Sequence, residues 1–174
     1  MIDRNQMIKV RIKAASLLGL LAQHNSLGEV ELYERLFLGK LRPVCQDLHW
    51  EVRKDMCTSL IHISRYIGKD KSFQYVLPEL KELLDDEEGE VVTEAIVSFQ
   101  KHLDQIYDEE FMAQDETMEM FVKLCDLTVE STMCLVDLAV VLKKLGKYIV
   151  AFNRPDDNQF LRCILKLINK ATKE

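Results

Sequence analysis

Three stretches of this 174-residue chain resemble one another at intervals of about 40 residues. They are MIKVRIKAASLL (7–18), HWEVRKDMCTSL (49–60) and GEVVTEAIVSF (89–99). Four residues take equivalent places at successive separations of 42, 39 and 40 positions, namely Lys9, Glu51, Glu90 and Glu130. A period of this length indicates small structural units that stack on one another, because one such unit cannot bury its apolar face alone.

Apolar residues recur every three or four positions through most of the chain, and this spacing predicts helices. We expect helices over 6–23, 29–46, 50–67, 73–84, 90–107, 115–127, 131–149 and from 156 onward. Gly68 should end the third helix, and Pro78 should begin or kink the fourth. Gly and Pro together make nine residues, too few for the frequent turns of a sandwich or barrel. The expected fold class is therefore all-α with about eight helices.

The same periodicity predicts which side chains form the core. On the first helix, the residues at core spacing are Val10, Ala14, Leu17, Leu18 and Leu21. Across the later helices, we expect one shared core of Val52, Met56, Leu60, Leu77, Leu80, Leu84, Ala95, Ile96 and Phe99. His102 falls at the position equivalent to Ile63, so it should be half-buried and hydrogen-bonded to a neighbour.

Charge is distributed unevenly along the chain, whose net charge is -6. Residues 1–70 carry 11 Lys/Arg against 8 Asp/Glu, residues 71–137 carry 4 against 18, and residues 138–174 carry 8 against 3. A nucleic-acid site needs Lys and Arg clustered along one face, and the acidic middle third opposes this. Nucleic acid is therefore not an expected partner.

Several classes of protein and site are disfavoured by the sequence. No apolar run approaches the roughly 20 residues of a membrane span, and the N-terminus lacks the apolar core of an export signal. Five cysteines at irregular spacing then indicate buried reduced thiols in the cytosol or nucleus, and we expect a cytoplasmic protein. They are Cys45, Cys57, Cys125, Cys134 and Cys163. Asp47 opens a turn between Cys45 and His49, which argues against a zinc site with Cys57 and His62. We expect no cofactor.

The motif D-x-x-x-E-V-R, present as DLHWEVR (47–53), resembles the turn within a HEAT repeat. Together with 76–91 and 151–171, the segment 45–68 resembles the HEAT-repeat regulatory subunits of protein phosphatase 4 more closely than the phosphatase 2A scaffold. The resemblance implies an α-α superhelix of the HEAT/armadillo type. It also implies a ladder of Asp and Arg between repeats, interrupted where Val92 replaces Arg.

On this basis we expect one HEAT-repeat solenoid over 1–174. It would contain a half repeat at 1–26, repeats at 29–68, 72–107 and 114–149, and a half repeat at 156–174. The residues expected to define the repeat are Asp47, Val52, Arg53, Asp86 and Val91. Both terminal half repeats lack a partner, so their apolar residues should be exposed or pack end to end between copies: Ile2, Met7, Ile8, Ile164, Leu167 and Ile168.

The resemblance also implies where a partner binds, because the turns within such repeats line one edge and contact the catalytic subunit. The residues this assigns are Leu48, His49, Trp50, Glu51, Glu87 and Glu88. Trp50 has two interpretations, as packing within the fold or as an exposed interface anchor. The acidic turn 85–90 also has two, as a solvated helix start or as a patch that attracts a basic partner.

The predicted function is a non-catalytic scaffold or regulatory subunit that binds a serine/threonine phosphatase catalytic subunit. The alternative is another HEAT adaptor, either tubulin-binding or transport-receptor-like. Tubulin presents an acidic surface, and the acidic turn 85–90 has the wrong sign to meet it. An enzyme is not expected, because no set of polar groups converges in the sequence.

Overall fold

The computed structural model describes residues 4–24 and 30–106, together with 122–124, 126–127, 162, 165–166, 168–169 and 172. The chain forms two compact units, Met1–Gln105 and Ile106–Glu174. All regular structure in the described residues is helical, which confirms the all-α prediction for them. The helix expected over 131–149 lies outside the described residues, and those described within 115–127 and from 156 onward are helical apart from a turn at 172.

The long helices of the first unit lie close to their predicted bounds. They are α1 (Arg4–Gln23), α4 (Trp50–Ile67) and α7 (Gly89–Ile106). Helix α4 has the bounds predicted for it, and it ends at Gly68, whose φ of 81° is readily adopted only by glycine.

Two helices predicted as continuous are interrupted. The segment 29–46 forms α2 (Val30–Phe37), a 3-10 turn η1 (Leu38–Lys40) and α3 (Leu41–Cys45). The segment 73–84 divides into α5 (Lys69–Tyr75) and α6 (Leu77–Leu83). Pro78 lies in the first turn of α6, where its missing N–H costs least, so the prediction that it begins or kinks a helix is confirmed.

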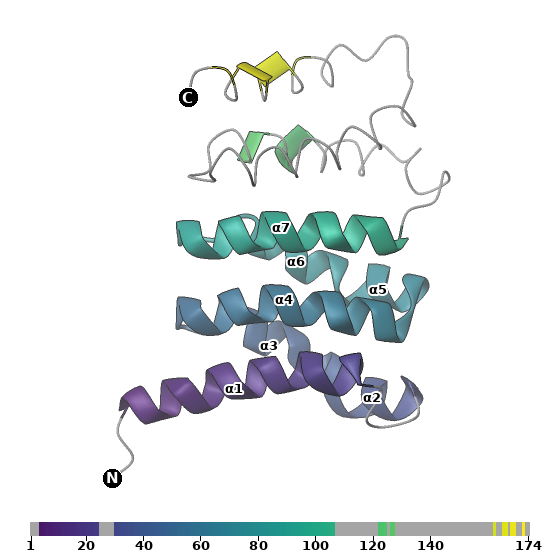
Figure 1. The fold of residues 1–174 in the computed structure, drawn as a ribbon. Coiled ribbons are helices and arrows are strands. Elements are labelled where there is room, and N and C mark those ends of the chain that lie inside the picture. The colour runs from purple at the N-terminus through teal and green to yellow at the C-terminus, as the bar shows by residue number, and fades with distance from the viewer. Residues whose placement is uncertain are drawn as a thin grey trace. The chain divides into compact units, whose positions relative to one another are not determined.

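Helices α1, α4 and α7 lie side by side in one layer, and the shorter helices lie behind them (Figure 1). Thr58 Oγ1 donates to Glu94 Oε1 at 3.0 Å, joining α4 to α7. In the second layer, Lys71 of α5 pairs with Glu34 of α2 at 2.6 Å. Buried Tyr33 connects the layers, because its hydroxyl donates to the Leu18 carbonyl at 2.9 Å.

The core between these layers contains the side chains expected there. All nine residues predicted for the shared core of the later helices are buried: Val52, Met56, Leu60, Leu77, Leu80, Leu84, Ala95, Ile96 and Phe99. His102 is also fully buried rather than half-buried, because α7 packs this turn against α4. Its Nδ1 lies 2.8 Å from Ser64 Oγ, which in turn lies 2.6 Å from Ser72 Oγ.

The predicted inward face of α1 is wrong for three of its five residues, because Val10, Ala14 and Leu17 are exposed whereas Leu18 and Leu21 are half-buried. Val10 is 67% exposed and Leu17 is 52% exposed. The opposite face of small residues packs on α4 instead, and Ser59 Oγ donates to the Ala15 carbonyl at 3.0 Å. A β-carbon placed on Gly19 would lie 2.8 Å from the Ser59 Cα, so the two backbones approach too closely for a larger residue.

Of the apolar residues expected to be exposed at the ends of the chain, three are described, and two of these are exposed as predicted. Met7 and Ile168 are exposed and Ile8 is half-buried, whereas Ile2, Ile164 and Leu167 lie outside the described residues. Within the second unit, Lys166 pairs with Asp126 at 2.7 Å. Among the described helices, none has the length and apolar character of a membrane-crossing segment.

Candidate protein-binding site

The turns before α4 and α7 have the same construction. Asp47 Oδ1 accepts the His49 backbone N–H at 2.9 Å, and Asp86 Oδ1 accepts the Glu88 backbone N–H at 2.9 Å. Each aspartate thus caps a turn two residues ahead of itself, a geometry that short acidic side chains favour. The 39-residue repeat in sequence is therefore also a repeat in local hydrogen bonding.

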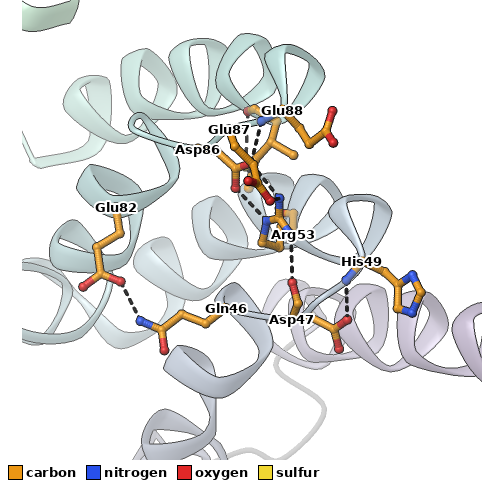
Figure 2. A network of polar contacts seen from close by, with 10 residues as sticks. Gln46, Asp47, His49, Arg53, Glu82, Asp86, Glu87 and Glu88 are labelled. Carbon is orange, nitrogen blue, oxygen red and sulfur yellow. Dashed lines mark hydrogen bonds and ion pairs between the residues drawn. The ribbon is translucent and has the colours of Figure 1, made fainter.

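Arg53 joins these two turns (Figure 2). Its Nε lies 2.6 Å from Asp86 Oδ2 and its Nη2 lies 2.7 Å from Asp86 Oδ1. Its Nη1 donates to the Asp47 carbonyl at 2.9 Å. The turn before α4 and the turn before α7 are therefore neighbours, held together by one guanidinium that is 10% exposed.

The charges of this pair stabilise each other. Burial disfavours ionisation of the Asp86 carboxyl, but the hydrogen bonds from Arg53 and the Glu88 backbone outweigh it and hold the pKa of Asp86 below its usual value. The hydrogen bond to Asp86 raises the pKa of Arg53, although burial acts against this. Both groups are therefore ionised at neutral pH. Their charges neutralise each other, so neither is free to bind a charged ligand.

A second arginine–aspartate contact lies one repeat earlier in the sequence. Arg11 Nε is 3.3 Å from Asp47 Oδ2, and Arg11 precedes Arg53 by the repeat separation of 42 residues. Each arginine thus reaches the aspartate of the following turn. The sequence motif identified Asp47, Arg53 and Asp86 but missed Arg11, which the repeat separation itself identifies. At the next position of the series stands Val92, as expected.

A further polar cluster that the sequence did not reveal lies beside the turns. Glu82 of α6 accepts hydrogen bonds from two side chains at the end of α3. Gln46 Nε2 donates to it at 2.8 Å (Figure 2), and Arg42 Nη2 donates to it at 3.1 Å. These groups are exposed, so their hydrogen bonds contribute little to stability. They form a polar surface beside the two turns.

The paired turns enclose a shallow, open cleft of about 430 Å³. Its lining comes from both turns and consists of Gln46, Asp47, Leu48, Arg53, Asp86 and Glu87. Leu48 is 92% exposed although it is a large apolar residue. Apolar exposure beside an acidic rim is typical of surfaces that contact other proteins, whereas an open cleft of this kind suits a small molecule poorly.

Trp50 is the first residue of α4 and is half-buried. Lys54 Nζ lies 5.7 Å from the centre of its ring and 2.7 Å from Glu90 Oε2. The Lys54 ammonium group thus lies over one face of the indole. Both interpretations of Trp50 keep support, because part of the ring packs within the fold and part of it faces solvent.

The other predicted contact residues lie along the same two turns. His49 and Glu51 are half-buried at the start of α4. Glu87 and Glu88 are exposed, and Glu87 Oε1 lies 3.9 Å from Arg53 Nη2. The structure therefore brings all six predicted contact residues to one edge of the first unit. Their binding role stays a prediction.

The described cysteines lie inside the fold rather than in a reactive site. Cys45 and Cys57 are free thiols and are buried, as predicted, whereas Cys125, Cys134 and Cys163 lie outside the described residues. Burial raises the pKa of both described thiols. They are therefore poor nucleophiles, since the reactive form of cysteine is the thiolate.

Comparison with known proteins gives two related matches. Over 165 residues, the chain is 28% identical to Serine/threonine-protein phosphatase 4 regulatory subunit 4 of Mus musculus and of Homo sapiens. The matched region covers 94% of this chain but only 18% of each relative. No protein-family model matches the sequence, and no solved structure does. These matches support a distant relation to that regulatory subunit.

Proposed function

We propose that this chain is a non-catalytic regulatory module that binds the catalytic subunit of a serine/threonine phosphatase. The observation that carries the proposal is the similarity to a phosphatase 4 regulatory subunit along 94% of the chain. The match spans 18% of that relative, so the proposal concerns only the part of the regulatory subunit that this chain resembles.

We propose further that the helices are HEAT repeats of a solenoid. Helices α1, α4 and α7 would be the second helices of successive repeats, and α2–α3 and α5–α6 the first helices. The repeat separations of 42 and 39 residues support this assignment, as do the Arg11–Asp47 and Arg53–Asp86 contacts between successive turns.

The proposed binding surface is the turn edge, defined as Leu48, His49, Trp50, Glu51, Glu87 and Glu88. Leu48 and the solvent-facing part of Trp50 would supply the apolar contact area that gives an interface its affinity. Glu87 and Glu88, being exposed, would attract a basic surface and accelerate association. The Arg53–Asp86 pair lies largely buried beneath this edge, with its two charges paired to each other.

Binding of the purified chain to purified phosphatase 4 catalytic subunit, measured by biolayer interferometry, tests the proposal. We expect a saturable complex from which Leu48→Ala and Trp50→Ala proteins dissociate faster, the latter at a cost of about 2 kcal/mol. Leu36→Ala is the matched control, because Leu36 is exposed on α2, away from the turn edge.

No complex with the catalytic subunit at micromolar concentrations would reject the proposal. Binding of the same chain to tubulin dimers, included as a parallel arm, would favour the alternative adaptor function instead. A complex that Leu48→Ala, Trp50→Ala and Leu36→Ala all leave unchanged would place the contact away from the turn edge.

A further inference from the structure

Helix α1 carries an uncovered apolar face. We define the α1 stripe as Met7, Val10, Ala14, Leu17 and Leu20, which recur every three or four residues and are all exposed. Four exposed large apolar side chains along one helix exceed the scattered apolar exposure of an ordinary surface. The opposite face of α1, built from small residues, already packs on α4.

The repeat relation indicates what shape of partner this face fits. Val10, Ala14 and Leu17 precede Val52, Met56 and Ser59 of α4 by 42 residues. All three α4 residues are buried, because other helices of the unit cover them. The α1 stripe is therefore equivalent to the inward face of α4, but it is exposed rather than buried. Because helices cover that face of α4, the element that complements the α1 stripe is a helix.

The charge along α1 indicates the chemistry of that helix. From Arg4 to Gln23 the sequence has four basic residues and no acidic one. Lys9 and Lys13 are exposed beside the α1 stripe and form no ion pair with any residue that the structure describes. Their counterparts on α4, 42 residues later, are the acids Glu51 and Asp55. The positions that are negatively charged on α4 are therefore positively charged on α1.

We propose that the α1 stripe binds an acidic amphipathic helix of a partner protein. Apolar residues of that helix would cover Val10 and Leu17, while its flanking carboxylates would pair with Lys9 and Lys13. This contact is separate from the turn edge and does not depend on phosphatase binding.

Charge decides against two other occupants. Residues 158–173 carry four basic and no acidic residues, so end-to-end contact between that segment of one copy and α1 of another would bring like charges together. An anionic membrane would attract Lys9 and Lys13. However, a membrane is an extended surface and would also repel residues 71–137, which carry 4 Lys/Arg against 18 Asp/Glu, whereas a single helix would contact only the α1 stripe.

Two synthetic peptides of about 18 residues test the proposal against the full chain by fluorescence anisotropy. Both have leucine along one helical face, and they differ only in having Glu or Lys beside it. We expect the Glu peptide to bind and the Lys peptide to bind at least about tenfold more weakly. Val10→Asp/Leu17→Asp should weaken the Glu peptide by at least about tenfold, whereas Leu36→Asp, on exposed α2 surface, should not.

Circular dichroism must show that the double variant keeps its helices. If it does not, Lys9→Glu/Lys13→Glu replaces it. That variant should bind the Glu peptide more weakly and the Lys peptide more tightly. Equal binding of both peptides, or binding unaffected by these variants, overturns the proposal. So does binding only to vesicles containing phosphatidylserine, which would assign the face to membranes. Concentration-dependent sedimentation abolished by Val10→Asp/Leu17→Asp would assign it to a second copy.

Discussion

The Arg53 guanidinium binds the Asp86 carboxylate, 33 residues further along the chain, through two nitrogens at 2.6 and 2.7 Å, and so connects the turns before α4 and α7. Both side chains are at most 10% exposed. Water therefore screens the pair little, and losing either partner leaves the other as a buried, uncompensated charge.

Replacing Arg53 with alanine should destabilise the protein by about 3 kcal/mol or more, because Asp86 then remains buried without its cation. Urea unfolding followed by circular dichroism measures the change. The control is Arg42→Ala, which breaks the exposed Arg42–Glu82 pair and should cost at most about 1 kcal/mol. Equal losses in the two variants would mean that burial of the Arg53 pair is not what matters.

Stability should fall on mild acidification because of His102. Burial lowers its pKa from 6.5 to about 4, so between these values the unfolded chain binds the proton more readily than the folded protein does. The contribution of His102 is complete above about pH 6.5 and decreases as pH falls towards 4. It amounts to about 3 kcal/mol over the whole window.

Denaturant midpoints measured from pH 7 to 4 for wild type and His102→Gln test this expectation. The glutamine variant should lose most of the slope, since Gln does not titrate. Glu79 acts in the opposite direction, because burial raises its pKa, and it is present in both proteins, so the difference between them isolates His102. Parallel curves would show that another group governs the acid response.

The close contact of α1 and α4 predicts that Gly19→Ala destabilises the protein. Alanine favours helix by about 1 kcal/mol over glycine, but its β-carbon would lie 2.8 Å from the Ser59 Cα. Overpacking against a backbone costs about 1–3 kcal/mol, so the net change should be a loss. Gly39→Ala is the control, because nothing lies within 4 Å of its added carbon, and thermal melts compare the two.

These features differ in how far the sequence reveals them. The turns before α4 and α7 are predictable because each aspartate acts on a backbone N–H only two residues away. The buried face of α1 is not predictable in this way. Both faces of that helix are apolar or small, and the choice depends on the approach of Ser59, which lies 40 residues beyond Gly19. Periodicity alone favours the larger side chains, Val10 and Leu17, and they are exposed.

The polar contacts show the same division. The Arg53–Asp86 pair was expected from the motif, whereas Arg11 required comparison with a residue 42 positions away. The Glu82 cluster depends on the break of the second helix at Leu38, which turns α3 towards α6. No local signal predicts its partners, because they are set by packing between helices.

The last prediction concerns the acidic part of the turn edge. Reversing charge with Glu87→Lys/Glu88→Lys should slow association with a phosphatase catalytic subunit and leave dissociation nearly unchanged, because exposed charges act mainly during approach. The effect should fade as salt is raised, since the screening length is about 8 Å at physiological ionic strength. Glu31→Lys/Asp70→Lys changes the net charge equally at exposed positions on α2 and α5. If this control slows association as much, the net charge of the protein, rather than the turn edge, attracts the partner.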